Sequence, residues 1–434
     1  MKFYLAIDIG ASSGRHIVGW VNNNEIETKE VYRFNNSVIL DNNHLVWDID
    51  NILKEVKEGI KVALKIFGRI ESMSIDTWGV DYVLMNEDKE ILPVYAYRDT
   101  RTKDVINKVH QLIPFNKLYE ITGSQFQEFN TIYQLYCDKL AGRLDNATDF
   151  LMIPEYLMYK LTNIKMKEYT NASTTGMMHL ESNDFSLKII TKLGLNHDLF
   201  KKLHKPGTIV GDFTKDVQEE LGGNIKVVLC STHDTASAVE GIIMKENAPY
   251  ISSGTWSLLG IKLEKGINTI ESLNANFSNE YGPDYIRYQK NIMGLWIIQS
   301  LAKQMKLDFP TMVKLAKKSD YKEIFDVNEQ CFLSSLDMKN EIINYFRKHN
   351  KPLPLNDNDI INSTYRSLAY SYNEALNELE KITKLKFDYI YIVGGGAKNQ
   401  YLNDLTEEFC LKKVIALPIE ATAIGNLYTQ MKRK

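Results

Sequence analysis

Short apolar runs bounded by turn residues alternate along the chain with longer segments in which apolar residues recur every three or four positions. The first runs, FYLAIDIG (3–10) and GRHIVGWV (14–21), predict two strands around the small-residue turn GASSG, and IETKEVYRF (26–34) predicts a third. Apolar residues at 49, 52, 53, 56, 60 and 64 then have the period of an amphipathic helix, which we expect to end at Gly68.

Further elements follow in the first half of the chain. IESMSID (70–76) and IKVVLCS (225–231) predict strands, and between them NTIYQLYCDKLAG (130–142) and PEYLMYKLT (154–162) predict helices.

A similar pattern opens the second half. APYISSGTWSLLGI (248–261) predicts a strand, a small-residue turn and a second strand, and residues 363–383 predict a long helix. FDYIYIVGGGAKNQYLNDLTEEF (387–409) predicts a strand, a glycine turn and a helix, and a short strand (412–417) and a last helix from about Glu420 close the chain. Two similar halves in 434 residues indicate two α/β domains of duplicated origin, at 1–240 and 241–434.

Composition narrows the class of protein. The chain is 44% hydrophobic and 25% charged, with a formal net charge of −3, so neither nucleic acid nor an anionic membrane surface is an expected partner. No apolar run is long enough to span a bilayer, and Asp8 interrupts the first run where a signal peptide would stay apolar. The four cysteines match no metal or disulfide spacing, which favours a reducing cytoplasm.

Three turns could hold phosphate. In DIGASSGR and in SSGTWS the backbone can approach a ligand closely, and Asp8 beside the first turn fits a bridging Mg²⁺. The alternative is that these Gly- and Ser-containing turns are ordinary hairpins, in which small residues are present for steric reasons only. VGGGAKN places three glycines at a strand end, where amides could contact a nucleotide. Neither a Gly-x-Gly-x-x-Gly dinucleotide motif nor a P-loop is present.

Carboxylates mark two further strand ends. SIDTWGVDY carries Asp76, Trp78, Gly79 and Asp81, which could hold a polyol or could form a strained turn with a core tryptophan. YRDTR, at 97–101, is either a second polar wall or a surface ion-pair cluster.

Asp234 raises the sharpest question. It follows an apolar strand and stands among small residues in CSTHDTASAVEG, where a buried carboxylate is costly unless it has a partner or a task. It could be a helix N-cap or a catalytic base, and the two roles are compatible.

Taken in order, these stretches resemble the FGGY carbohydrate kinases over essentially the full length. The motifs that carry the resemblance are AIDIGASSGR, SIDTWGVDY, YRDTR, QEFNTIYQL, THDTASAV, YISSGTWSL, NIMGLWIIQ and IVGGGAKNQYLND. The resemblance implies the actin-like (ribonuclease H-like) ATPase fold, in which two α/β domains flank a deep cleft. It also implies transfer of the γ-phosphoryl group of ATP to the 1-hydroxyl of L-rhamnulose, with Mg²⁺.

The resemblance also implies roles for individual residues. Asp234 is expected to be the general base and to contact the sugar, and Asp8 is expected to face Mg²⁺. The further expected sugar contacts are Trp78, Gly79, Asp81, His233, Thr235 and Asn291. The expected nucleotide contacts are Ala11, Ser12, Ser13, Gly14, Arg15, Thr255, Gln299, Gly394, Gly395 and Gly396.

Several alternatives stay open at this point. Another ketose, such as L-fuculose or D-xylulose, would need only a few altered contacts. A non-catalytic actin-like sugar sensor or an ATP-driven chaperone would use the same scaffold for another purpose. The expected protein is a monomer or a homodimer.

Overall fold

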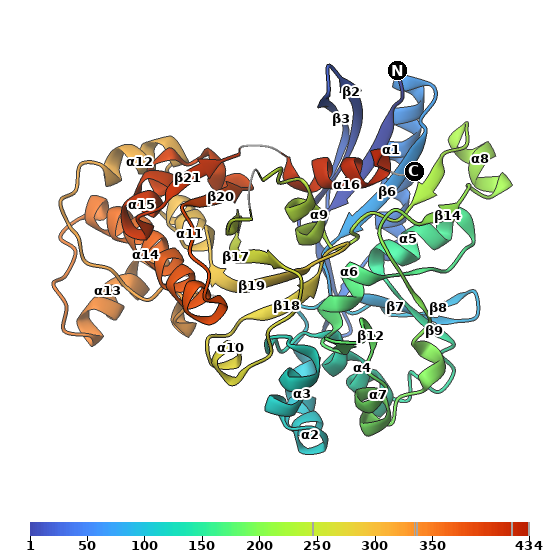
Figure 1. Cartoon of the computed structure of the whole chain (residues 1–434), viewed down its shortest axis with the longest axis horizontal. Coiled ribbons are helices and arrows are strands. Elements are labelled where there is room, and N and C mark those ends of the chain that lie inside the picture. Colours follow the sequence, from blue (N-terminus) through green and yellow to red (C-terminus); the bar gives the residue numbers. More distant parts are fainter. Residues whose placement is uncertain (245–246, 334, 336, 418–419, 433–434) are drawn as a thin grey trace. The chain divides into compact units, whose positions relative to one another are not determined.

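The computed structural model describes residues 1–244, 247–333, 335, 337–417 and 420–432, and the chain forms two compact units (Figure 1). Unit 1 comprises residues 1–243, 263–288 and 420–434, and unit 2 comprises residues 244–262 and 289–419. Compactness depends on contacts and not on chain order, so segments from the second half of the sequence belong to unit 1. The domain boundary expected at residues 240 and 241 stays a prediction.

Within the described residues, unit 1 is built on a six-stranded mixed sheet with the order β14-β15-β6-β1-β2-β3. Its strands are β1 (Tyr4–Ile9), β2 (Ser13–Asn22), β3 (Glu25–Asn35), β6 (Ser72–Thr77), β14 (Ile209–Gly211) and β15 (Lys226–Val228). β1 pairs antiparallel with β2 and parallel with β6, and β2 pairs antiparallel with β3. The three strands predicted at the start of the chain are confirmed.

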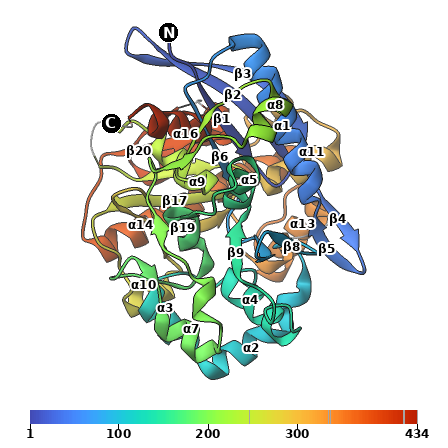
Figure 2. The same cartoon turned by 90° about the vertical axis from the view of Figure 1, so that its right-hand side faces the viewer.

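Helices cover both faces of this sheet. α1 (Ile49–Phe67) and α5 (Ile153–Thr162) share one core with Leu5, Ile7 and Ile9 of β1. The alternate residue Ala6 packs instead against α16 (Ala421–Met431), which in turn packs on α9 (Asp234–Glu240). In Figure 2, α1 and α16 lie on opposite sides of the blue strands. Because side chains alternate along a strand, Asp8 belongs to the face with Ala6, toward α16.

The rest of unit 1 forms a second core of short helices around a three-stranded sheet, β8-β7-β9. Figure 2 shows its helices α2, α3, α4 and α7 gathered at the bottom of the view. The strands are β7 (Tyr82–Asn86), β8 (Lys89–Ile91) and β9 (Asp149–Met152), and the helices are α2 (Lys103–Leu112), α3 (Phe115–Thr122), α4 (Thr131–Leu140) and α7 (Leu187–Leu193). Smaller elements are β4 (Val38–Asp41), β5 (His44–Trp47), β10 (Lys167–Glu168), α6 (Tyr169–Ala172), β11 (Met178–His179), β12 (Asp184–Phe185), β13 (Leu203–His204), α8 (Lys215–Leu221), α10 (Ile270–Asn274) and β18 (Ser278–Tyr281).

Unit 2 repeats the strand arrangement of unit 1. β16 (Tyr250–Ser253) pairs antiparallel with β17 (Trp256–Leu263) and parallel with β20 (Tyr389–Val393), as β1 pairs with β2 and β6. The order continues as β19-β17-β16-β20-β21, and β19 (Ile286–Met293) begins in unit 1 and ends in unit 2. β21 spans Lys413–Ala416. The β-turn-β pattern predicted for each half is therefore confirmed.

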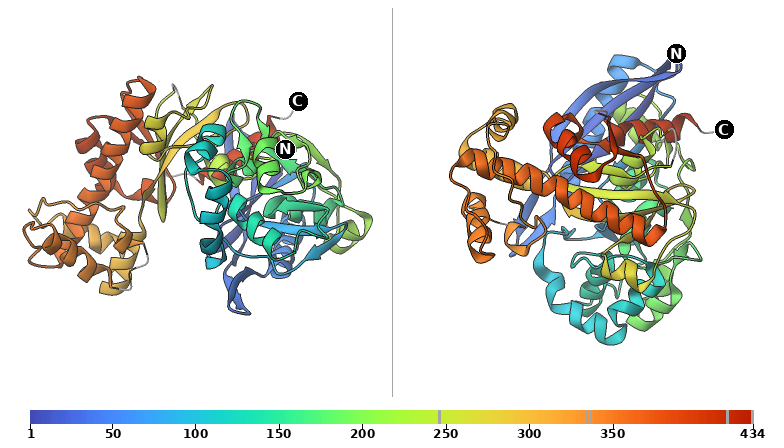
Figure 3. Two further views of the ribbon diagram at one scale, coloured as in Figure 1. Left: turned by 90° about the horizontal axis from the view of Figure 1, so that it is seen from below. Right: turned by 60° about the vertical axis from the view of Figure 1, so that its left-hand side comes forward.

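Helices of unit 2 pack around a long central one. α14 (Asp357–Thr383) contacts α15 (Gln400–Cys410), α12 (Phe309–Ala316) and α11 (Trp296–Met305), and α11 also contacts α13 (Met338–Lys348). Figure 3 shows α14 in orange along its length. Among the helices described, none has a stretch long and apolar enough to cross a bilayer.

Candidate active site

Two carboxylates lie side by side at the ends of neighbouring strands. Asp8 of β1 and Asp76 of β6 are partners in the parallel register, and both are buried. Arg15, opposite Asp8 on β2, donates from Nε and Nη2 to Asp8 Oδ2 at 2.9 and 2.7 Å, and it also pairs with Glu420. Asp8 is thus held by the arginine of the first small-residue turn.

Asp76 is held from the other side by α16. Asn426 Nδ2 donates to Asp76 Oδ2 at 2.5 Å, whereas Asp76 Oδ1 is buried and has no hydrogen-bond partner among the described protein atoms. Burial raises the pKa of Asp76 well above its usual range, and the charges of Asp8 and Asp234 add to this rise. Burial also raises the pKa of Asp8, against the opposing effect of Arg15. The register of β1 with β6 and the bridge between Thr77 and His233 bring Asp8, Asp76 and Asp234, the carboxylate cluster of unit 1, to the same end of the sheet.

Asp234 stands at the start of α9, directly after the turn that follows β15. His233 is the N-cap residue and makes no side-chain capping bond, so the N-cap alternative for Asp234 is wrong. Asp234 Oδ1 accepts from Thr235 N at 2.5 Å and from Thr235 Oγ1 at 3.1 Å. The Asp234 side chain keeps 31% of its surface exposed, which leaves the carboxylate accessible to a ligand.

The turn before Asp234 is fixed by Glu168, a buried glutamate that lies outside the sequence motifs. Glu168 Oε2 accepts from Thr232 N at 3.1 Å and from Thr232 Oγ1 at 2.7 Å, and Thr232 O accepts from Thr77 N at 2.9 Å. Glu168 also accepts from the backbone N–H groups of Thr170 and Asn171. No local sequence pattern connects Glu168 with a threonine 64 positions away.

His233 lies between two carboxylates. Its Nε2 is 3.4 Å from Asp234 Oδ1, and its Nδ1 is 3.2 Å from Glu280 Oε2. Arg287 Nη2 donates to Glu280 Oε2 at 2.9 Å and lies 3.3 Å from His233 Nδ1. Glu280 and Arg287 belong to β18 and β19 and were not predicted as site residues, because they lie outside the recognisable motifs.

The carboxylate of Asp81 is fully occupied by the protein. It accepts from Trp47 Nε1 at 2.7 Å, Trp78 Nε1 at 2.9 Å, Tyr97 N at 3.0 Å and Gln134 Nε2 at 3.0 Å. Trp78 is buried, and Val80 in the same turn has φ of 67°, which is strained for a β-branched residue. A sugar contact by Trp78 or Asp81 stays a prediction, while this geometry favours the structural alternative.

Gly79 lies in the same turn under tight packing. A Cβ there would lie 2.7 Å from Thr174 Cγ2, and Thr174 Oγ1 accepts from Val80 N at 2.9 Å. Close packing therefore requires glycine at position 79.

The first small-residue turn is closed by its own backbone. Gly10 N donates to Ser13 O at 2.9 Å, and Asn36 binds the turn twice, through Ser12 O and Gly10 O. A Cβ on Gly14 would overlap the Phe34 ring. Ala11, Ser12 and Ser13 are left at least partly exposed at the end of β1.

In unit 2, three predicted nucleotide segments come together. Leu295 N donates to Gly254 O at 2.8 Å and Trp296 N donates to Thr255 O at 3.2 Å, which brings the start of α11 onto the SSGTWS turn. Gly394 has φ of 83°, and a Cβ there would lie 2.7 Å from Ser253 O. The glycine turn after β20 therefore packs directly on the end of β16.

The remaining predicted residues of unit 2 surround this junction. Thr255 and Gly395 are exposed, Gly394 is half-buried and Gly396 is buried against Ser253. Gln299 lies half-buried on α11, three residues after Trp296. Asn291 is half-buried on β19. Gly394 caps a short 3₁₀ turn (Gly395–Lys398), and α15 begins only after this turn, at Gln400, so the predicted order of strand, glycine turn and helix is confirmed.

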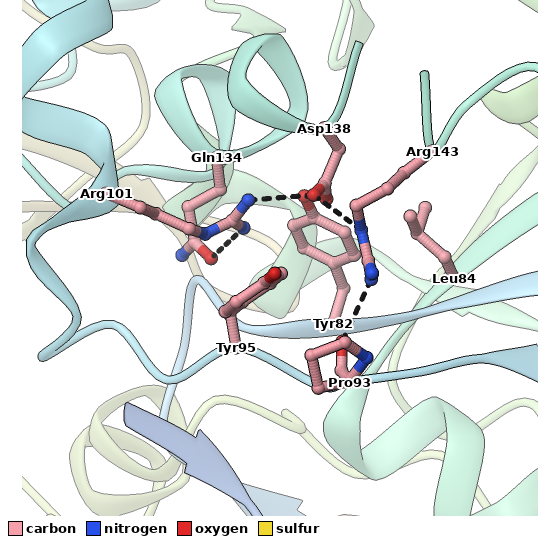
Figure 4. A pocket seen from close by; sticks show the side chains of 8 residues that line it. All are labelled: Tyr82, Leu84, Pro93, Tyr95, Arg101, Gln134, Asp138 and Arg143. Atoms are coloured by element: carbon pink, nitrogen blue, oxygen red, sulfur yellow. Dashed lines mark hydrogen bonds and ion pairs between the residues drawn. The ribbon is translucent and has the colours of Figure 1, made fainter. Parts of the chain in front are cut away.

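The YRDTR segment forms a structural ion-pair cluster. Arg101 Nη1 and Arg143 Nε lie 2.7 and 2.9 Å from Asp138 Oδ1, and the Arg101 guanidinium stacks 4.1 Å from the Tyr95 ring centre. Figure 4 shows both arginines converging on Asp138, with Tyr82 beside it. The segment thus takes part in an ion-pair cluster, but the cluster is buried and not on the surface as that alternative expected, and its carboxylate, Asp138, lies outside the motif.

Comparison with known sequences identifies the family. The sequence model described as the FGGY family of carbohydrate kinases, N-terminal domain, matches residues 3–241, and that of the C-terminal domain matches residues 249–433. The chain belongs to the FGGY carbohydrate kinases. It is therefore an ATP-using carbohydrate kinase, as the motifs indicate.

Individual FGGY kinases resemble the whole chain. A rhamnulokinase from Oceanobacillus iheyensis is 42% identical over 433 residues, covering 98% of this chain and 92% of that protein. A rhamnulokinase from Bacillus subtilis is 37% identical over 435 residues, covering 99% and 90%.

Solved FGGY kinase structures show the same fold. A ligand-bound xylulose kinase from Lactobacillus acidophilus superimposes with a TM-score of 0.84 at 14% identity, covering 100% of this chain and 89% of that one. A glycerol kinase from Plasmodium falciparum with ADP gives a TM-score of 0.80 at 15% identity, covering 99% and 89%. The predicted actin-like fold with two α/β domains is confirmed.

Proposed function

We propose that this kinase transfers the γ-phosphoryl group of ATP to the 1-hydroxyl of L-rhamnulose, giving L-rhamnulose 1-phosphate and ADP. The observation that carries the proposal is the identity of 42% and 37%, over nearly the full chain, with two proteins named rhamnulokinase. The matched regions cover 98% and 99% of this chain and therefore include both units.

Asp234 is the proposed general base. A sugar hydroxyl is a weak nucleophile, and a carboxylate that takes its proton as the bond to phosphorus forms contributes about 10²–10⁴-fold in rate. The carboxylate is partly exposed, and the preceding turn is held by Glu168 and Thr77, so Asp234 has both access and a fixed position. His233 and Thr235, on either side of it, are the proposed sugar contacts, together with Gly79 and Asn291.

Each unit contributes a different ligand site in this proposal. In unit 1, residues 11–15 face the phosphates, where exposed hydroxyls and Arg15 suit an anion. In unit 2, Thr255, Gln299 and the glycine turn 394–396 hold the nucleotide, supported by the packing of these segments on one another.

The carboxylate cluster of unit 1 fits Mg²⁺. Asp76 has a buried oxygen without a hydrogen-bond partner among the described residues, and burial together with the nearby charge of Asp234 raises the pKa of both Asp8 and Asp76, as expected where a cation would relieve repulsion. Mg²⁺ is usually bound by one or two carboxylates, with phosphate oxygens and water completing its ligands. Asp8 is the proposed ligand, and bound Mg²⁺ would neutralise charge on the phosphates.

The working enzyme is proposed to act in the cytoplasm, where ATP is supplied, as a monomer or a homodimer. Its proposed partners are a sugar and ATP only.

The test is ADP release by the purified chain with Mg²⁺-ATP and a panel of ketoses that includes L-rhamnulose, L-fuculose and D-xylulose. We expect strong preference for L-rhamnulose, and a loss of about 10²–10⁴-fold in kcat for Asp234→Asn with the fold retained. Glu219→Gln, at an exposed position on α8, is the control and should match the unchanged enzyme.

The possible outcomes separate the parts of the proposal. If the enzyme prefers another ketose, the proposed kinase activity stands and the proposed substrate, L-rhamnulose, is wrong. A folded chain that binds ATP but shows no sugar-dependent turnover would overturn the catalytic proposal and favour a sugar sensor.

A further inference from the structure

A buried carboxylate held by neutral donors lies behind the turn that leads to the proposed base. The Glu168 side chain is fully buried, and its two oxygens accept five hydrogen bonds from described residues, each of 3.1 Å or less. The donors are the N–H and hydroxyl of Thr170, the N–H and hydroxyl of Thr232, and the N–H of Asn171. Taking a carboxylate out of water is costly, so this many donors on one side chain indicate a fixed position.

The donors to Glu168 belong to two segments far apart in the sequence. Thr170 and Asn171 lie in the first turn of α6, whereas Thr232 lies two residues before Asp234. A second link joins the same segments, because Asn171 Nδ2 donates to Thr232 O at 3.3 Å. Glu168 and Asn171 therefore hold both the N–H and the C=O of Thr232, which fixes the backbone that leads into Asp234.

The segment that begins with α6 also holds the turn that contains Gly79. Thr174 Oγ1 donates to Asn171 O at 2.8 Å and accepts from Val80 N at 2.9 Å. A Cβ on Gly79 would lie 2.7 Å from Thr174 Cγ2, so the two segments are in close contact. A short series of contacts therefore runs from Glu168 through Thr174 to the Gly79 turn.

We propose that Glu168 is a positioning residue of the sugar site, which holds the base Asp234 and the Gly79 turn in one fixed arrangement. The inference rests on the proposed function, because it takes Asp234 as the base and Gly79 as a sugar contact. Glu168 itself touches no reacting atom. Its described hydrogen bonds all lie within unit 1, whereas the proposed nucleotide segments at 255, 299 and 394–396 belong to unit 2.

The consequence for the reaction is one of distance. The sugar O–H bond breaks as its oxygen bonds phosphorus, the bond from phosphorus to the β-phosphate oxygen breaks with its electron pair leaving on ADP, and the proton moves to Asp234. This transfer needs the carboxylate within about 2.6–3.2 Å of the hydroxyl, and a misplacement of about 1 Å can cost about 10²-fold in rate. Movement of the Asp234 turn relative to the Gly79 turn changes this distance, because one carries the base and the other contacts the sugar.

Glu168→Asp separates the link from the cap that Glu168 provides for α6. Glu168 is the N-cap residue and accepts from Thr170 N and Asn171 N, and aspartate is a favoured N-cap residue. Because aspartate is one methylene shorter, it can keep the cap while its carboxylate withdraws from Thr232. Thr232→Val is the second variant, since it removes only the hydroxyl that donates to Glu168. Ile189→Ala, a truncation of a buried side chain on α7, is the control for lost stability alone.

Hydrogen–deuterium exchange of the full chain tests the link without turnover. In Glu168→Asp the amides of residues 77–80 and 231–235 should both exchange faster, because both segments lose the same support. Peptides of α7 should keep their exchange rates in that variant, and Ile189→Ala should show the reverse pattern. Faster exchange at 231–235 alone overturns the proposal, since Glu168 would then not hold the Gly79 turn.

Steady-state kinetics give a readout that a general loss of stability would not move in the same way. Glu168→Asp is expected to lower kcat by roughly tenfold to a hundredfold and to raise KM for the sugar, with KM for ATP unchanged. Thr232→Val should shift kcat and KM for the sugar in the same directions by a smaller factor. Ile189→Ala, assayed where it is folded, should keep all three values.

The outcomes distinguish this inference from the proposed function. A folded Glu168→Asp enzyme with unchanged kcat overturns the inference, and so does an equal fall in kcat for Ile189→Ala. If the unchanged chain phosphorylates no sugar but its two segments exchange faster together in Glu168→Asp, the positioning is supported and the proposed function is refuted. If Glu168→Asp does not fold, Thr232→Val decides by the same two measurements.

Discussion

Buried carboxylates in unit 1 differ by what surrounds their oxygens. Asp81 accepts four hydrogen bonds, whereas Asp76 keeps one oxygen without a partner among the described atoms. A carboxylate whose two oxygens both accept hydrogen bonds stabilises a turn, whereas a carboxylate oxygen without a donor is available to a cation or a substrate. Both belong to one sequence motif, SIDTWGVDY, whose residue types alone do not separate the two roles.

Glu155 shows how one buried group sets a pH dependence. Its oxygens accept from Glu168 N at 2.6 Å and Met152 N at 2.9 Å, and burial raises its pKa to about 8. The unfolded chain has the ordinary value of 4.5, so between pH 4.5 and about 8 the folded form binds more protons. The free energy of unfolding therefore falls as pH rises through this window.

Replacing the Glu155 side chain should make the free energy of unfolding depend less on pH. We expect Glu155→Gln to lower stability overall, because an amide NH₂ then faces a backbone N–H. The slope against pH should nevertheless be shallower, by up to about 1.4 kcal/mol per pH unit. Urea unfolding at pH 5, 6, 7 and 8 measures both effects. Parallel curves for Glu155→Gln and the unchanged chain would refute the assignment, and Glu219→Gln should keep the original slope.

At the scale of elements, the site depends on how closely two helices approach. α9 carries Asp234 at its first turn, and it packs on α16 where both have glycine. A Cβ on Gly425 would lie 1.8 Å from Ser237 O, and a Cβ on Gly241 would lie 2.1 Å from Ala421 O. Backbone contact at this distance is possible only with glycine on both sides.

Gly425→Ala should therefore separate α9 from α16. Overpacking of this kind costs about 1–3 kcal/mol, and we expect kcat to fall as well because Asp234 moves with α9. Urea unfolding and steady-state kinetics on the same sample measure the two effects. Gly223→Ala is the matched control, since its Cβ would make ordinary contacts with Leu64 at 3.5 Å. If Gly425→Ala and Gly223→Ala have the same stability and the same kcat, the close contact between α9 and α16 is not needed for either property.

Most elements near the site were predictable from local pattern. The alternation in β1 and the apolar stripe of α1 predict strand, helix and core face directly, because each depends on residues a few positions apart. The contacts of Glu168, Asn426 and Glu280 were not predictable. Each joins segments far apart in the sequence, and one sequence carries no signal of such a contact.

At the scale of the whole molecule, the two compact units do not coincide with the two halves of the sequence. The repeated β-turn-β pattern predicts two similar halves, and both units have that arrangement. The pattern gives no reason for residues 263–288 and 420–434 to join unit 1. Their place depends on side-chain fit, such as Leu427 packing on Ala6 and Ile17, which local periodicity does not encode.

The last segment should therefore stabilise unit 1, although it is the end of the second half of the sequence. Gln430 accepts from Ser72 Oγ at 2.7 Å and donates to Leu5 O at 3.0 Å, and Asn426 holds Asp76. Removing residues 420–434 exposes the apolar surface under Leu427 and frees these groups. Loss of one buried leucine alone costs about 2–5 kcal/mol, so unit 1 should unfold at clearly lower urea.

Tryptophan fluorescence can follow unit 1 by itself. Trp20, Trp47 and Trp78 belong to unit 1, and Trp256 and Trp296 belong to unit 2, so a background with Trp256→Phe and Trp296→Phe reports unit 1 alone. In that background a chain ending at residue 419 should lose its transition at a lower urea concentration than a chain ending at residue 432. Coincident transitions would mean that α16 adds little to unit 1. An early transition would mean that the proposed base and its carboxylate neighbours depend on the C-terminal helix for their fold.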